Sequence, residues 1–136
     1  MSRRERLGGA TLVLVTCPDR ESADRIASSL TTKRLAACVS VAEGVRSLYR
    51  WKGKIEEAGE LLLMIKTRRR ILDRVVYEVK LNHPYQTPEI LALPIIGGSQ
   101  EYLRWLIEET SHPTDPCRSG GVVDDSTSKR GCRYDR

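Results

Sequence analysis

The chain has 136 residues, of which 40% are hydrophobic and 30% charged, with a formal net charge of +5. This length allows one domain with a substantial core and is too short for two. The composition is ordinary for a soluble protein, and no apolar run approaches the roughly 20 residues of a membrane-spanning helix, so we expect no membrane partner. Four cysteines without metal-binding spacing indicate a reducing compartment.

A strand and a helix are expected first. Residues 11–17 (TLVLVTC) form a continuous aliphatic run of strand length, which Pro18 ends. Asp19 is a good helix N-cap. The apolar residues that follow have the spacing of one helical stripe: Ala23, Ile26, Ala27 and Leu30.

An extended hairpin is expected next. Residues 36–41 and 45–52 have strand character and are separated by a bend or bulge at Glu43 and Gly44. Gly53 allows a tight turn, after which residues 55–67 return, with the polar stretch 56–60 (EEAGE) expected to be exposed. Such a hairpin is too long for a small monomer to cover, so we expect its tip to pair with another chain.

We expect two helices and one strand in the last part of the chain. Thr67 is a candidate cap for a helix that ends near Asn82, just before Pro84. Residues 89–96 (EILALPII) read as a strand, which Pro94 assigns to a sheet edge or a bulge. Ser99 is a candidate cap for a final helix.

This order of elements predicts an α+β fold. With right-handed crossovers it gives an antiparallel sheet with two helices on one face, which is a ferredoxin-like βαββαβ sandwich with an extended hairpin and a C-terminal helix. We expect a flexible arm at residues 1–9, the folded domain at residues 10–112 and a disordered tail at residues 113–136.

The segment 82–93 (NHPYQTPEILAL) carries the main candidate site. Pro84 and Pro88 stiffen it and hold His83 and Glu89 on extended backbone. Two roles for His83 are open. It can bond a free carbonyl at the end of a helix, or it can bind a metal together with Cys17 and Glu89, which come from the end of the first strand and the start of the last.

Other chemistry is weakly indicated. The basic cluster at residues 66–70 (KTRRR) could hold an anion or could simply be a solvated helix start. No phosphate loop, metalloprotease motif or nucleophile–base pair is visible, so we expect no enzymatic activity. The two central strands carry no aromatic residue on which bases could stack, so we expect no nucleic-acid partner.

Six segments together resemble the CutA family of divalent-cation tolerance proteins. They are TCPD (16–19), RLAACV (34–39), SLYRWKGKI (47–55), LLLMIKT (61–67), HPYQTPEILALPI (83–95) and YLRWL (102–106). The resemblance implies a ferredoxin-like subunit in a tight homotrimer, similar to the PII nitrogen-signalling proteins. It also implies a cytoplasmic protein that binds copper or another divalent cation in response to metal.

The resemblance also implies a set of metal ligands. The copper ligands proposed for bacterial members are one cysteine and two adjacent histidines, and the corresponding positions here are Val15, Asn82 and His83. Of the three proposed ligands only the histidine at position 83 is present, and Cys17 and Glu89 are the candidate replacements for the other two. The alternative function is a non-enzymatic, PII-like signalling or scaffold trimer, which would bind a small anion or a partner protein through residues 66–70 and the grooves between subunits.

Overall fold

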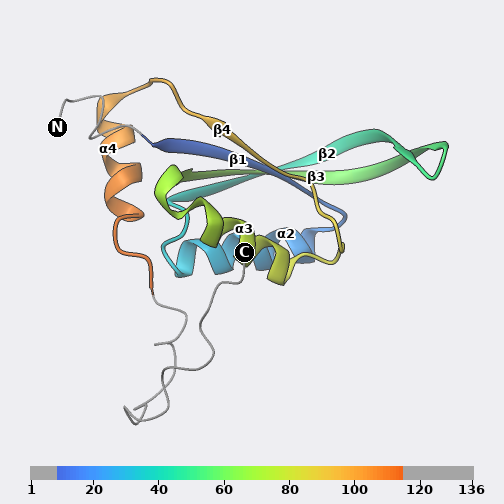
Figure 1. The fold of residues 1–136 in the computed structure, drawn as a ribbon, viewed down its shortest axis with the longest axis horizontal. Coiled ribbons are helices and arrows are strands. Elements are labelled where there is room, and N and C mark those ends of the chain that lie inside the picture. The colour runs from blue at the N-terminus through green and yellow to red at the C-terminus, as the bar shows by residue number, and fades with distance from the viewer. Residues whose placement is uncertain (1–8, 115–136) are drawn as a thin grey trace, which may run out of the picture.

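The computed structural model describes residues 9–114 and contains a four-stranded antiparallel sheet with the strand order β2-β3-β1-β4 (Figure 1). The elements are β1 (Ala10–Cys17), α2 (Arg20–Thr32), β2 (Cys38–Trp51), β3 (Lys54–Arg68), the 3₁₀ turn η1 (Arg69–Ile71), α3 (Leu72–Asn82), β4 (Ile90–Pro94) and α4 (Gln100–Glu109). This arrangement confirms the predicted ferredoxin-like sandwich. Within residues 9–114 no helix is long and apolar enough to cross a membrane.

The core lies between one face of the sheet and the helices α2 and α3, which run along that face (Figure 1). Alternate residues of β1 and β3 point into it, as the two-residue period of a strand requires. The fully buried apolar residues of this core include Val13, Val15, Leu63 and Ile65 from the sheet, and Ile26, Leu30, Val75 and Val79 from the helices. Each such side chain contributes about 1.5–3 kcal/mol by leaving water.

The opposite face of the sheet is also apolar. Leu12 lies beside Leu93 in the register, and Leu14 lies between Met64 and Leu91. Leu91 is 52% exposed. Helix α4 stands at one end of the sheet, where Leu103 and Leu106 pack against Ala10 (Figure 1). Among the described residues nothing else covers this surface, which we call the open face.

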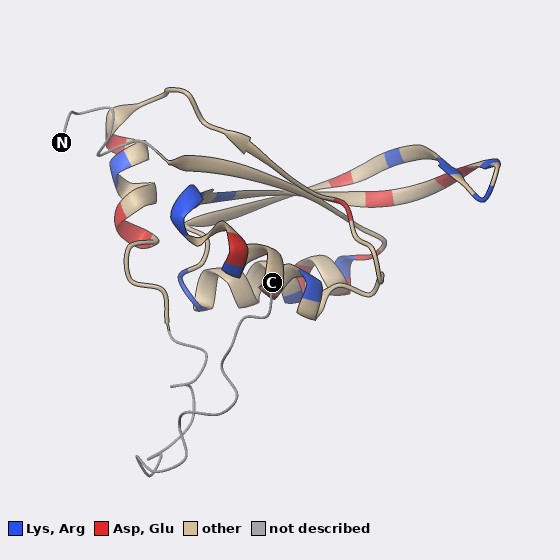
Figure 2. Ribbon diagram, in the orientation of Figure 1, with Lys and Arg blue, Asp and Glu red and all other residues tan. Residues whose placement is uncertain are grey.

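The hairpin of β2 and β3 projects beyond the helices (Figure 1). Its turn is formed by Lys52 and Gly53, whose φ angles of 49° and 77° are those of a type I′ turn. The predicted bulge is present between Ala42 and Val45. On this arm the outer part of β2 and the turn carry basic residues, and β3 carries acidic residues (Figure 2). Leu48, Trp51 and other apolar side chains of the arm are exposed.

Two boundaries differ from the sequence-based prediction. Thr67 is not a helix cap. It lies inside β3, paired with Thr11, and its hydroxyl donates to the Leu35 carbonyl at 2.7 Å. The helix starts only after η1, because the ladder with β1 holds the chain extended as far as Arg68. The last strand is shorter than residues 89–96 and begins at Ile90, so Glu89 precedes it.

The other predicted ends are confirmed. Asp19 caps α2 by accepting a hydrogen bond from the Ser22 amide, and Ser99 caps α4 by accepting one from the Tyr102 amide. Pro94 lies on the edge strand β4, where its missing N–H costs no ladder bond. The predicted arm and tail fall almost entirely outside the described residues and stay predictions.

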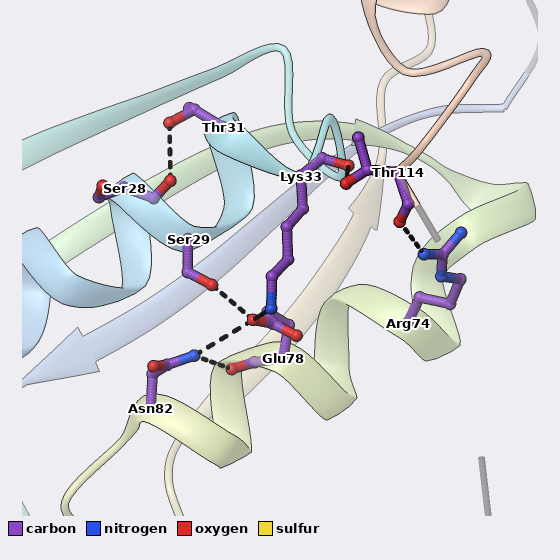
Figure 3. Close-up of polar contacts among 8 residues, drawn as sticks. All are labelled: Ser28, Ser29, Thr31, Lys33, Arg74, Glu78, Asn82 and Thr114. Carbon is purple, nitrogen blue, oxygen red and sulfur yellow. Dashed lines mark hydrogen bonds and ion pairs between the residues drawn. The ribbon is translucent and has the colours of Figure 1, made fainter. Parts of the chain in front are cut away.

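A buried carboxylate joins the two core helices (Figure 3). Glu78 of α3 accepts hydrogen bonds from Ser29 and from Lys33, whose ammonium lies 2.6 Å away. Burial alone would raise the pKa of Glu78, but the bonds from Lys33 and Ser29 and the charge of Lys33 outweigh it, and the pKa is lowered. Thr114 adds a second link, since its amide donates to the Lys33 carbonyl at 3.0 Å and its carbonyl accepts from Arg74 at 2.8 Å (Figure 3).

We therefore expect the variant Glu78→Gln to be less stable than the wild type by about 1–3 kcal/mol at neutral pH, because the ion pair with Lys33 is lost. A folded-state pKa below the ordinary glutamate value of 4.5 gives a contribution that is present above that value and is lost as the pH falls through the lowered pKa. The difference in the free energy of unfolding should therefore shrink in acid. Urea unfolding at several pH values measures it.

Glu109→Gln is the matched control, since Glu109 forms a surface pair with Arg34 at 3.7 Å. This variant should change the stability by less than about 0.5 kcal/mol. Equal losses in the two variants would show that the Glu78 pair does not join the helices.

Candidate functional site

His83 follows the last residue of α3 and is buried. Its Nδ1 accepts a hydrogen bond from the Tyr85 amide at 3.0 Å, so the ring proton is on Nε2, which donates to the Thr16 carbonyl at 2.7 Å. Both ring nitrogens are therefore used within the fold. The imidazole ties the end of α3 to the end of β1, which is the structural role that the sequence left open.

Cys17 is the last residue of β1 and is fully buried in the core. Burial, together with the negative charges of Asp19 and Glu60, raises the pKa of its thiol to about 11. Only the thiolate is a strong metal ligand. At neutral pH this side chain is a protonated, small apolar group rather than a ready ligand.

The surroundings of Glu89 differ from those of His83 and Cys17. It is exposed and lines an open groove of about 890 Å³ between the hairpin arm and the segment from Pro84 to Glu89. Within residues 9–114, no group of three His, Cys, Asp or Glu side chains could hold a metal ion. The three predicted ligands, as arranged here, are not a preformed metal centre.

At two positions this chain lacks the metal ligand proposed for bacterial members. The residues found there, Val15 and Asn82, have structural roles. Val15 is buried in the core beneath the helices. The Asn82 side chain donates to the Glu78 carbonyl at 2.9 Å, and the Asn82 carbonyl accepts from Arg25 at 3.0 Å. Both contacts of Asn82 satisfy free groups at the end of α3.

The groove contains residues that sequence reasoning did not select as a site. The aromatic rings of Tyr49, Trp51 and Tyr85 line it, as does the carboxylate of Glu60. The stretch 56–60 was expected to be exposed, but Glu60 is buried because it lies where β3 passes the end of β1. The two-residue spacing of Tyr49 and Trp51 along β2 was the sequence signal for this groove, since it places both rings on one side of the hairpin.

Comparison with known proteins places this arrangement in a family. The model of the CutA1 divalent ion tolerance proteins matches residues 11–109. The chain belongs to the CutA1 family.

Its relatives share the fold closely. The divalent-cation tolerance protein CutA of Thermus thermophilus is 48% identical over 99 residues, which are 73% of this chain and 96% of the relative. Its solved structure has a TM-score of 0.73, covering 74% of this chain and 98% of that one. CutA1 from Oryza sativa superimposes with a TM-score of 0.73 at 44% identity, covering 76% of this chain and 96% of the other.

Some relatives are longer. The chloroplastic CutA of Arabidopsis thaliana is 46% identical over 99 residues, which are 73% of this chain but only 54% of that protein. The chain thus spans about half the length of this CutA1 relative. Compartments also differ, since a structure from Archaeoglobus fulgidus is described as periplasmic.

The side chains of the basic cluster at residues 66–70 of this CutA1 chain lie in different environments. Lys66 donates to the Ser40 hydroxyl at 2.5 Å on the open face. Arg68 is half-buried, and desolvation, followed by the charge of Arg70, lowers its pKa. Arg69 and Arg70 are exposed. Residues 66–70 therefore differ in exposure, and their role in anion binding stays a prediction.

We expect Cys17 to resist alkylation in the folded protein, because it is buried and its thiol stays protonated at every pH well below about 11. Iodoacetamide treatment at pH 8, followed by peptide mass spectrometry, measures this. The same treatment in guanidinium chloride is the control and should label Cys17 fully. Rapid labelling of the native protein would contradict the assignment of Cys17 to the core.

Proposed function

We propose that this chain is a homotrimeric divalent-cation tolerance protein, which binds copper or another divalent cation reversibly and catalyses no reaction. The observation that carries the proposal is the uncovered apolar face of the sheet in a chain of the CutA1 family. We place the protein in the cytoplasm, because no feature of the sequence indicates an oxidising compartment.

The open face supports an assembly. Single-chain proteins rarely expose a large continuous apolar patch. Here Leu12, Leu14 and Met64 lie half-buried beside the exposed Leu91 and Leu93. Copies of the same chain would cover this patch, and a closed ring is the usual way in which identical subunits satisfy such surfaces. The number three is what the resemblance to the CutA family implies.

We expect Leu91→Asp to dissociate the assembly. In a lone chain this exposed position would tolerate aspartate, whereas in the proposed interface the variant would bury a charge without a partner. Light scattering should give three times the 15.4 kDa chain mass for the wild type and a smaller mass for the variant.

Leu81→Asp is the matched control, because Leu81 is 64% exposed on α3, away from the open face. It should leave the mass unchanged. A wild-type mass near one chain, or no effect of Leu91→Asp, would contradict the proposed assembly.

Metal binding at Cys17, His83 and Glu89 would require local rearrangement. For Nε2 of His83 to bind the metal, its proton would move to Nδ1, so the ring would lose its bonds to the Thr16 carbonyl and the Tyr85 amide. Cys17 would have to release a proton that its thiol holds up to about pH 11. Glu89 is exposed and could turn toward the ion. These costs favour weak, exchangeable binding over a permanent centre, which suits a response to changing metal levels.

We therefore expect copper affinity to rise with pH, because the metal must displace the proton of the Cys17 thiol, whose pKa is raised to about 11. His83→Gln should lower the affinity at least about ten-fold, since an amide can still donate a hydrogen bond but is a poor copper ligand. Calorimetric titration of the purified assembly with Cu²⁺ measures both effects, and circular dichroism checks the fold.

Glu56→Gln is the control, because Glu56 is an exposed carboxylate on the hairpin arm. It should leave copper binding unchanged. Binding that is equal in the wild type and in His83→Gln would exclude His83 as a ligand, while the family and the assembly would stand.

A further inference from the structure

Glu60 is a buried charge without a partner. It is 9% exposed, and within residues 9–114 its carboxylate has neither a hydrogen bond nor an ion pair. Its charge acts on Cys17 and on Tyr85, neither of which is a cation. Burying an ionised carboxylate is costly unless a cation or hydrogen-bond donors compensate it. The Glu60 carboxylate oxygens are not among the fully buried unpaired atoms of the described residues, so they reach the groove, where a cation could pair with them.

The surroundings of Glu60 indicate which kind of ligand. The side chains of Tyr49, Trp51 and Tyr85 line the same groove and are each substantially exposed. Aromatic faces attract cations through their quadrupole, most strongly for Trp and Tyr. A carboxylate beside several such rings is a common way to bind an organic ammonium or guanidinium group.

The other charges of the groove do not compensate Glu60. Arg46 also lines it, but its Nε already pairs with Glu57 at 3.0 Å. Glu89 adds a second carboxylate. The lining is therefore aromatic and negative.

We propose that this groove binds a small organic cation, whose ammonium or guanidinium group pairs with Glu60 and packs against the rings of Tyr49, Trp51 and Tyr85. A volume of about 890 Å³ lies in the range of small-molecule sites and exceeds what a bare ion needs. A metal ion would fit poorly, because divalent cations need several converging ligands and residues 9–114 offer no such group. This inference does not depend on metal binding by His83.

The test uses the assembled protein with a metal chelator present. The probes are choline and agmatine, and the neutral control is 3,3-dimethyl-1-butanol, which has the shape of choline without its charge. Calorimetry and tryptophan fluorescence should show saturable binding of at least one of the two cations and none of the alcohol. Because Trp51 lies in the groove, its emission should change on binding.

Matched variants locate the site. Glu60→Gln keeps the shape of the side chain and removes its charge, so it should weaken cation binding at least about ten-fold. Glu56→Gln, on the same strand but outside the groove, should have no effect. Trp51→Leu should weaken binding several-fold, and since Trp51 is 58% exposed the fold should tolerate it even if Glu60→Gln does not.

Four results would overturn the inference. The first is no binding of either cation, and the second is equal binding of choline and the neutral alcohol. The third is binding that survives both Glu60→Gln and Trp51→Leu. A crystal structure of the assembly with a lysine or arginine of a neighbouring copy against Glu60 would likewise overturn it, by giving the carboxylate a different partner. None of these results would bear on copper binding at His83.

Discussion

The structure depends on one constraint, which is that a four-stranded sheet has two faces and helices α2 and α3 cover only one of them. The covered face is closed by aliphatic packing and by the buried Glu78 contact with Lys33. The other face presents leucines and a methionine in register across β1, β3 and β4. Water in contact with that face costs free energy in proportion to its apolar area. The long hairpin raises the same problem, since its outer half extends beyond anything the described part of the chain can pack against it.

His83 illustrates how a family motif can serve the fold first. The proline after it ends α3, and the two hydrogen bonds of its ring fix the turn against the end of β1. A histidine that makes two such bonds is a poor metal ligand until one of them is broken. The histidine is therefore compatible with weak exchange of a cation and unsuited to a tight, permanent centre, whatever other ligands are available.

Most of the fold could be predicted from the sequence because its signals are local. Asp19, Ser99 and Gly53 determine caps and a turn within a few residues, and the two-residue and 3.6-residue periods assign the elements between them. Thr67 was misassigned because pairing with Thr11, a contact between distant residues, overrides its capping tendency. The site was less predictable for the same reason. Neither the buried state of Cys17's thiol nor the bonds of the His83 ring can be read from spacing alone.

Glu60 shows this limit most clearly. In sequence it is one of three glutamates in the stretch 56–60, and Glu56 and Glu57 are indeed exposed. What distinguishes it is its position. It pairs with Val45 just beyond the bulge, at the point where the free arm of the hairpin meets the sheet and the segment after Pro84 passes nearby. A glutamate on the outer arm is solvated from all sides, whereas at this junction Glu60 is 9% exposed and no charged group among the described residues pairs with it. Its carboxylate faces the groove, so a cation held there would meet a negative charge that no described residue pairs with.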